Sequence, residues 1–188
     1  SMSGTFEDLD VPPTLCSFAV TVGDVKDVVS PEFKEAGHKV YLVKPEYDKN
    51  GLPVAESLIK IYDKVYNLIS SKKAVAVWTP IGGGIAEGVM KMSFGNDIGF
   101  KYAEGVTLEE IFAYNYGSFI IEMTEDCGCK CGCCTLLGET TADGSITMGE
   151  DSVKIADLLK IYEDKLEPVF PCNIEQKQEN IPTFTTNV

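Results

Sequence analysis

The sequence predicts an α+β domain in which helices lie against a layered, mixed β-sheet. Two long stretches, 54–70 and 153–166, repeat apolar residues at helical spacing, whereas several shorter runs are apolar and rich in β-branched residues. Residues 74–102 combine a strand, a glycine turn, a helix and a second strand. Residues 133–148 contain two β-rich runs around Ala142-Asp143-Gly144, which predicts an antiparallel hairpin. Such a hairpin favours a mixed sheet over a doubly wound parallel one.

The first third of the chain is expected to contain two strands and one long helix. Residues 1–13 look irregular, and the apolar run 14–23 predicts a buried strand. Ser30-Pro31 is typical of a helix start, and 39–43 alternates apolar side chains as a short strand does. The helix predicted over 54–70 has one apolar stripe, formed by Leu58, Ile61, Tyr62, Val65, Leu68 and Ile69.

The middle of the chain carries clear local signals. Residues 74–78 predict a strand, 85–93 a short helix and 98–102 a second strand. Thr107 and Glu110 have the spacing of a capping box, which predicts a short helix that continues through 114.

The last third begins with a strand predicted over 117–123. The hairpin follows, and Asp151-Ser152 then has the composition of a cap for the final helix. Residues 172–188 are polar and have no periodicity, so we expect a flexible linker there.

Composition and charge exclude several classes of protein. The chain has 188 residues, a net charge of −13 and no apolar run near the length of a membrane span. Its start is polar and acidic, unlike a signal peptide, so we expect a cytoplasmic protein that does not bind a membrane. The acidic balance argues against nucleic acid as a partner. Every basic side chain is lysine, so a phosphate site must use main-chain N–H groups, lysine or a metal.

The glycine turn is the strongest candidate for a binding site. Gly82, Gly83 and Gly84 stand between a predicted strand and a predicted helix, where free N–H groups attract anions. The alternative is that the glycines only let the helix pack closely on the sheet. The spacing matches neither a Walker A loop nor the dinucleotide-binding fingerprint.

The cysteines cluster in one short segment. Five of the seven are Cys127, Cys129, Cys131, Cys133 and Cys134. Thiolates at alternate positions of an extended strand share one face and suit a soft metal such as Cu(I) or Zn²⁺. The paired spacing of a structural zinc site is absent, so we assign no metal here and expect a surface hairpin with reduced thiols. Metal binding by this cluster stays open as the alternative.

Three other residues bear on function. His38 is the single histidine and has no nucleophile motif near it, so we expect a surface residue. Lys91 and Lys101 flank the glycine unit in sequence, and either could meet a phosphate.

Four stretches resemble one family. They are VPPTLCSFAVTVGDVKDVVSPEFKEAG, VWTPIGGGIAEGVMKMSFGNDIGF, YGSFII and KLEPVFP. Their order and spacing resemble phosphoribosylformylglycinamidine synthase, in its second domain of the aminoimidazole ribonucleotide synthetase C-terminal type. The resemblance implies a partly ferredoxin-like fold over 14–171. It also implies that 1–13 ends a preceding domain and that 172–188 leads toward a glutaminase domain.

The resemblance also implies a function. The family converts formylglycinamide ribonucleotide, ATP and glutamine to the amidine, ADP, phosphate and glutamate. The partners would be the preceding ATP-binding domains and the following glutaminase domain of the same chain. ATP and Mg²⁺ would serve the full-length enzyme, and none is expected on this chain alone. The catalytic residues would lie in those other domains and are unknown here, so we expect the isolated chain to be inactive.

Carried onto this sequence, the phosphate-binding residues are Thr79, Gly82, Gly83 and Gly84. The chain departs from the family just before the glycines, where Trp78 to Ile81 contain no ionisable group. Main-chain contact with phosphate survives that departure, whereas an acid, base or Mg²⁺ role at the turn does not. Whether the site serves catalysis or holds a structural nucleotide stays open.

The sequence leaves two rival functions. Other ATP-dependent enzymes of the superfamily, such as selenophosphate synthetase or thiamine-phosphate kinase, fit less well, because the PPTLCSFAV and LEPVFP stretches argue against them. The rival from another class is a cysteine-rich metal-binding or interaction module.

Overall fold

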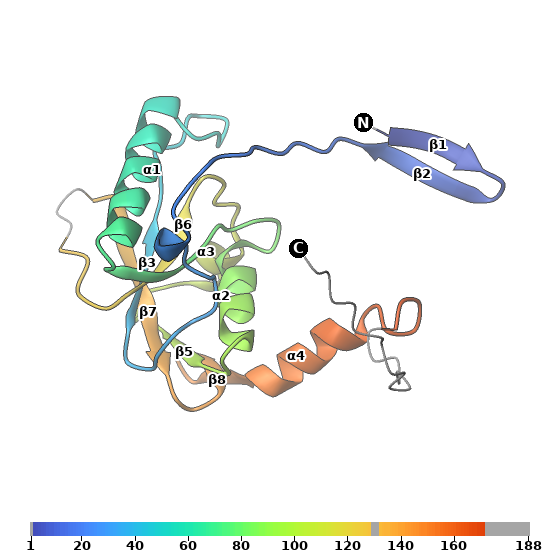
Figure 1. The fold of residues 1–188 in the computed structure, drawn as a ribbon. Coiled ribbons are helices and arrows are strands. Elements are labelled where there is room, and N and C mark those ends of the chain that lie inside the picture. Colours follow the sequence, from blue (N-terminus) through green and yellow to red (C-terminus); the bar gives the residue numbers. More distant parts are fainter. Residues whose placement is uncertain (1, 129–131, 172–188) are drawn as a thin grey trace, which may run out of the picture.

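A computed structural model describes residues 2–128 and 132–171 and has an α+β fold (Figure 1). Over these residues a mixed sheet of seven strands forms the centre, in the order β4-β6-β3-β7-β5-β8-β9. Neighbouring strands are antiparallel except β5 and β8, which are parallel. The layered, mixed sheet expected from the sequence is therefore confirmed. The strands are β3 (Lys39–Val43), β4 (Ala74–Trp78), β5 (Gly99–Tyr102), β6 (Phe119–Met123), β7 (Cys134–Thr141), β8 (Ser145–Met148) and β9 (Asp151–Lys154).

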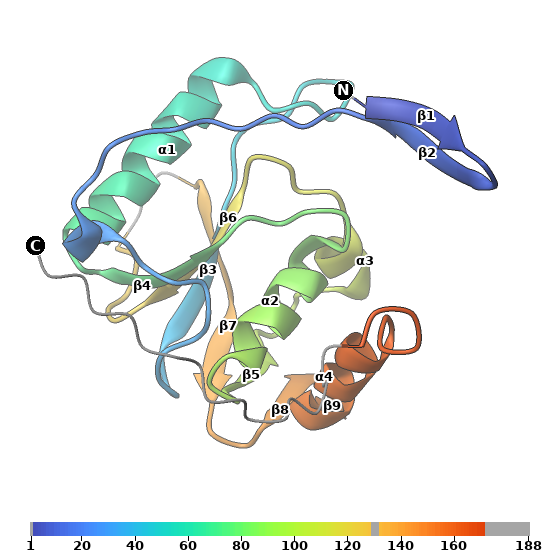
Figure 2. The ribbon, with the colours of Figure 1, turned by 45° about the vertical axis from the view of Figure 1, so that its right-hand side comes forward.

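Helices pack on both faces of this sheet (Figure 2). On one face, α1 (Ala55–Ser70) packs through Ile61 and Val65 against β3, β4 and β6. On the other face, α2 (Gly84–Phe94) buries Ile85, Val89 and Met92 in the larger core, next to α3 (Leu108–Phe112). The last helix, α4 (Ile155–Asp164), lies beside α2. Among the described residues, no helix has the length and apolar character needed to cross a bilayer.

The structure confirms several elements that the sequence predicts from local signals. The strands over 39–43 and 74–78 have the predicted bounds, and the long helix starts one residue later than predicted. The capping box is present, because Thr107 Oγ1 accepts the Glu110 N–H at 3.3 Å and Glu110 Oε2 accepts the Thr107 N–H at 2.9 Å. The helix α3 ends at Phe112, two residues before the predicted end.

The predicted hairpin over 133–148 was wrong. The Asp143 turn does form, because its Oδ1 accepts the Ser145 N–H at 3.0 Å and the Thr141 hydroxyl at 2.8 Å. However, β5 lies between β7 and β8 and pairs with both of them. A local turn signal does not reveal that a third strand from elsewhere in the chain enters the gap.

The start of the final helix was also misplaced. Asp151 and Ser152 belong to β9, which pairs with β8 across a turn at Gly149. The helix begins only at Ile155, after Lys154. The predicted cap residues therefore extend the sheet instead of starting the helix.

The N-terminal predictions were wrong as well. Residues 1–13 were expected to be irregular, but β1 (Met2–Phe6) and β2 (Leu9–Thr14) form an antiparallel pair that lies apart from the main sheet (Figures 1 and 2). The run expected to be a buried strand is extended and exposed, with Leu15 at 84% and Phe18 at 89%. An apolar pattern predicts burial, but the described residues supply no surface that covers this run.

Residues around Ser30 show why no helix starts there. A short 3₁₀ turn, η1 (Val25–Asp27), precedes them. The Ser30 hydroxyl donates to Glu32 Oε1 at 2.6 Å instead of capping a helix. Lys34 Nζ also binds Glu32 Oε1 at 2.6 Å. The Lys34 ammonium, followed by the Ser30 hydroxyl, lowers the pKa of Glu32 to about 2.

A buried carboxylate fastens this segment to the sheet. Glu122 of β6 is 0% exposed, and its oxygens accept the N–H groups of Lys34 at 2.8 Å and Glu35 at 3.2 Å. His38 Nδ1 lies 2.7 Å from Glu122 Oε1, and the His38 side chain is only 19% exposed. His38 was expected at the surface, and that prediction was wrong, because its partner is distant in sequence.

We expect Glu122→Gln to lower the free energy of unfolding by about 1–3 kcal/mol, because an amide cannot accept all three donors. Urea unfolding measures the change. The matched control is Glu125→Gln, since Glu125 is exposed and forms a surface ion pair with Lys73; there we expect less than about 0.5 kcal/mol. Equal losses at both positions would contradict the account of Glu122.

Candidate functional site

The glycine turn leaves the end of β4 and begins α2. Thr79 and Gly82 are exposed, Gly83 is partly buried and Gly84 is buried. The Gly84 N–H donates to the Ile81 carbonyl at 2.8 Å, which closes the turn tightly. A Cβ added at Gly82 would meet no atom within 4 Å, so this part of the turn is open. Of the four predicted phosphate-binding residues, Thr79 thus follows β4 directly, and Gly82, Gly83 and Gly84 lead into the start of α2.

One N–H group at this helix start already binds an anion from the protein itself. The Gly83 N–H donates to Glu87 Oε2 at 2.9 Å, and Glu87 Oε1 pairs with Lys91 Nζ at 2.7 Å. The Lys91 ammonium, and then the Gly83 N–H, hold the pKa of the Glu87 carboxyl below its ordinary value. Glu87 is therefore a charged group that stands where an external anion would bind.

The Lys91 ammonium lies near two aromatic rings. Its Nζ lies 5.8 Å from the centre of the Trp78 ring and 5.4 Å from that of Tyr162. Glu87 raises the pKa of Lys91, so the ammonium is kept charged. Lys91 reaches the turn only indirectly, through Glu87, whose other carboxylate oxygen accepts the Gly83 N–H.

An apolar cavity of about 430 Å³ opens beside the turn. Gly83 and Glu87 form one edge of it, and the opposite walls come from α3, β8, β9 and α4. Its lining is mainly carbon, with Met90, Ile111, Phe112, Ile146, Met148 and Leu158 among the residues that form it. A flat aromatic group suits such a cavity, while an attached anion would lie near the turn.

A second cavity lies on the other side of the start of α2. It measures about 440 Å³ and is lined by Ile85 together with Lys44, Glu110 and Asn115. Its polar lining includes an ammonium group that sequence reasoning did not associate with the glycines. Lys44 follows β3 directly, and only the sheet order brings that position near α2.

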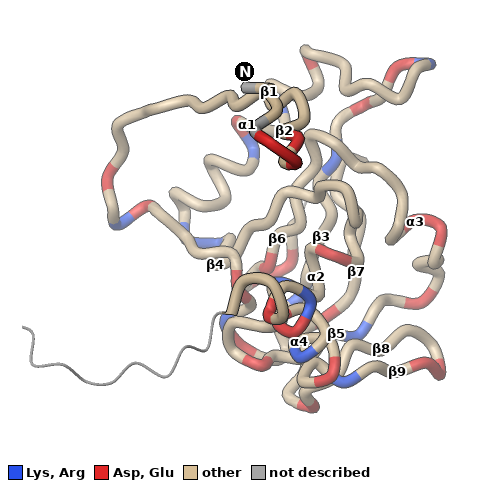
Figure 3. The backbone as a smooth tube through the Cα atoms, turned by 90° about the vertical axis from the view of Figure 1, so that its right-hand side faces the viewer, with Lys and Arg blue, Asp and Glu red and all other residues tan. Residues whose placement is uncertain are grey.

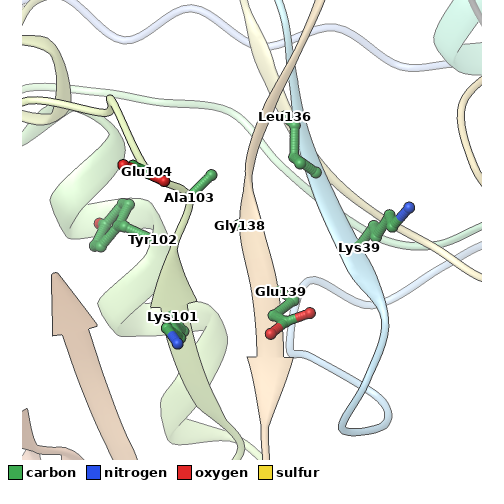
Figure 4. Close-up of a pocket in the computed structure, with 8 residues that line it drawn as sticks. All are labelled: Lys39, Lys101, Tyr102, Ala103, Glu104, Leu136, Gly138 and Glu139. Atoms are coloured by element: carbon green, nitrogen blue, oxygen red, sulfur yellow. The ribbon is translucent and has the colours of Figure 1, made fainter. Parts of the chain in front are cut away.

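Lys101 does not belong to the glycine site. Its strand neighbours Phe100 and Tyr102 point into the core under α2, so Lys101 points to the opposite face of the sheet. There it lines a hollow of about 310 Å³ with Lys39 and Glu139 (Figure 4). The expectation that Lys101 could meet a phosphate at the turn is not met.

Acidic and basic residues both occur at many places along the described backbone (Figure 3). The whole chain has 29 acidic and 16 basic side chains. Several of the lysines are paired, including Lys39 with Asp126 and Lys73 with Glu125.

The cysteine segment lies in the connection from β6 to β7. Cys127 and Cys134 are partly buried, and Cys133 packs at the edge of the core under α1. Reduced thiols were expected throughout this segment, and that expectation was wrong at Cys133, which is disulfide-bonded. Cys129 and Cys131 lie outside the described residues. Within the part of the chain that the structure describes, no group of three or more acidic, histidine or cysteine side chains is placed to hold a metal ion.

We expect the cysteines to be dispensable for folding. Replacing Cys127, Cys129, Cys131 and Cys133 together by serine should leave the melting temperature within a few degrees, as a change below about 1 kcal/mol would give. The reason is position, because the segment only borders the core. Thermal unfolding under reducing conditions measures this. Loss of the fold together with loss of bound stoichiometric zinc would show instead that a metal site holds the domain together.

Comparisons with known proteins agree with this architecture. No family model matches the chain, and no curated protein sequence matches it. Phosphoribosylformylglycinamidine synthase II from Thermotoga maritima is similar in structure, with a TM-score of 0.55 and 9% identity over 84% of this chain and 30% of that one. T. maritima PurL complexed with ADP gives 0.55 and 10%, over 85% and 30%. The same protein complexed with FGAR gives 0.55 and 10%, over 86% and 33%.

These values define the class of the fold. The chain has the layered α+β fold of an aminoimidazole ribonucleotide synthetase-like domain, as expected. It spans about a third of the length of these three structures. At such low identity the likeness establishes the fold alone.

Proposed function

We propose that this chain is a domain of a purine-biosynthesis ligase of the phosphoribosylformylglycinamidine synthase type, and that it forms one wall of a substrate- and nucleotide-binding cleft. In this proposal Thr79, Gly82, Gly83 and Gly84 form one wall of a phosphate or nucleotide site. The observation that carries it is the open glycine turn at the start of α2, next to an apolar cavity. The sequence resemblance supports it, as does the fold shared with a synthase that was solved with ADP and with FGAR.

The chemistry at the turn is binding and orientation. A phosphate would accept hydrogen bonds from main-chain N–H groups. The dipole of α2 would stabilise the bound anion by about 0.3–1 kcal/mol at an exposed site. To bind at Gly83 it would displace the Glu87 carboxylate, which Lys91 is placed to retain. The Glu87 carboxylate, held by Lys91, thus takes the place of a ligand and accepts the Gly83 N–H when no phosphate is bound.

The turn does not fit a Mg²⁺ site. Magnesium prefers carboxylate oxygens in octahedral geometry. Residues 79–84 contain no carboxylate, and the nearby Glu87 already binds an ammonium and an N–H group. We therefore assign no metal ligand here, and in the proposal the ATP–Mg²⁺ ligands belong to the preceding domains. The cysteine-rich metal module gains no support from the described residues.

The isolated 188-residue chain is expected to lack synthase activity. No glutaminase nucleophile motif and no acidic ATP–Mg²⁺ motif is recognisable in its sequence. The measurement is turnover of formylglycinamide ribonucleotide with ATP and glutamine, with the longer protein that carries the flanking domains as the positive control. Turnover by the chain alone at a rate comparable with the control would refute the proposal that the catalytic residues lie in other domains.

A further inference from the structure

Two cysteine thiols lie side by side away from the glycine turn. Cys127 Sγ donates a hydrogen bond to Cys134 Sγ over 3.2 Å. Cys127 belongs to the connection after β6, and Cys134 is the first residue of β7. Both are partly buried, so small reagents reach them while the protein restricts their motion. The function proposed above makes no use of this pair.

Both cysteines are anchored to the same strand. Cys134 pairs with Val43 of β3 and packs against the core under α1. Asp126, which precedes Cys127, binds Lys39 Nζ and the Tyr41 hydroxyl, the latter at 3.2 Å. The Tyr41 hydroxyl also hydrogen-bonds the backbone of Cys127. Because β3 holds both ends, the short distance between the two sulfurs is set by the fold.

A disulfide lies next to this pair of thiols. Cys133, next to Cys134, is disulfide-bonded, and its Sγ lies 3.3 Å from Lys64 Nζ of α1. Thiol and disulfide groups therefore share one surface. A hydrogen-bonded thiol pair next to a disulfide is suited to thiol–disulfide exchange, whose rate depends on access and on which sulfur is attacked.

We propose that Cys127 and Cys134 form a reversible redox pair that a low-molecular-weight disulfide oxidises. One cysteine thiolate attacks a sulfur of the small disulfide, breaks its S–S bond and releases one small thiol. The second cysteine thiolate then attacks the protein sulfur of the mixed disulfide and releases the second small thiol. The two protons lost by the cysteines end on the two small thiols. The sulfurs need to approach by only about 1 Å to reach the S–S bond length of about 2.05 Å.

The test uses the position of Lys130 between the two cysteines. Trypsin cleavage after Lys130 separates peptide 102–130, which contains Cys127, from peptide 131–154, which contains Cys134. In the 188-residue chain carrying Cys129→Ser, Cys131→Ser and Cys133→Ser, only the proposed pair can join these peptides. We expect oxidised glutathione to join them with a mass loss of about 2 Da, and a thiol reductant to separate them. Adding Cys134→Ser should abolish the link.

A denatured sample shows whether the fold brings the thiols together. At the same ratio of reduced to oxidised glutathione, guanidinium should lower the linked fraction about tenfold or more, since unfolding removes the pre-organised proximity. Equal linkage in the native and the denatured chain would overturn the proposal. It would also be overturned if the native cysteines stop at mixed disulfides with glutathione, or if bound zinc protects them while the peptides stay separate.

The unsubstituted chain provides a second measurement in case the serine variant folds poorly, which circular dichroism reports. Fragmentation of the joined peptides by mass spectrometry identifies the linked cysteines in the wild-type sequence. Linkage of Cys127 to Cys134 that is gained on oxidation supports the proposal. Linkage only through other cysteines contradicts it.

Discussion

Replacing Gly84 by alanine is expected to lower the free energy of unfolding by about 2–5 kcal/mol, the combined cost of backbone strain and overpacking. Gly84 has a φ of +67°, where side chains are disfavoured. A Cβ there would lie 2.6 Å from the Ile111 carbonyl oxygen and 2.8 Å from that of Ala113. Because both contacts are with backbone, α3 would have to move away from α2. Urea unfolding monitored by circular dichroism measures the loss.

Gly82 is the matched control in the same turn. A Cβ at Gly82 meets nothing within 4 Å, and no positive φ is required there. Gly82→Ala should therefore change the free energy of unfolding by less than about 0.5 kcal/mol. If Gly84→Ala were as mild as Gly82→Ala, the close packing of α2 on α3 would not depend on this glycine.

The second large effect is expected in binding. Gly83→Val should weaken nucleotide binding at the turn by about tenfold or more, a loss of at least ~1.4 kcal/mol. A Cβ at Gly83 approaches Glu87 Cβ at 2.6 Å and Oε2 at 2.7 Å, and Gly83 has an ordinary φ of −88°. The Glu87 carboxylate can rotate away, but Glu87 Cβ is fixed to the backbone of α2, so the first turn of the helix has to shift. Circular dichroism is the control that the fold persists. The branched valine would then cover the N–H groups that a phosphate needs.

Under the proposed function, the two interpretations of the glycines made from the sequence apply to different residues. Gly84 is required for close packing, which was the alternative interpretation. Gly82 lies in open space and is free to meet a ligand. Gly83 lies between these roles, since its N–H binds Glu87 in the chain itself. Sequence spacing located the turn, but the division of roles depends on where α3 lies.

Local signals predicted local structure well. The strands at 39–43 and 74–78 and the Thr107 capping box depend on neighbouring residues only, and all three are present. The predictions failed where distant segments decide the outcome. The strand β5 separates β7 from β8, and the apolar run after Thr14 stays exposed in the described residues.

The site shows the same limit. The hydrogen bond from the Gly83 N–H to Glu87 could have been predicted from the sequence, because a glutamate four residues after a glycine at a helix start lies on the same face of the helix. The Glu122–His38 pair was not, because 84 residues separate the partners. Likewise, only the fold brings Lys44 to a cavity beside the start of α2.

Main-chain amide signals of the turn test the central claim most directly. The 188-residue chain is titrated with ADP while nuclear magnetic resonance follows the amides of Gly82, Gly83 and Gly84. The matched control is Gly23→Val, the same substitution at an exposed glycine with no atom within 4 Å of an added Cβ. Because this chain supplies only one wall of the proposed site, the account predicts weak ADP binding, seen as shifts at Gly82 and Gly83 that grow with ADP concentration in the wild type and in Gly23→Val and are lost in Gly83→Val. The account would be contradicted if ADP left the Gly82 and Gly83 amide signals unchanged in the wild type, or if the shifts in Gly83→Val equalled those in the wild type.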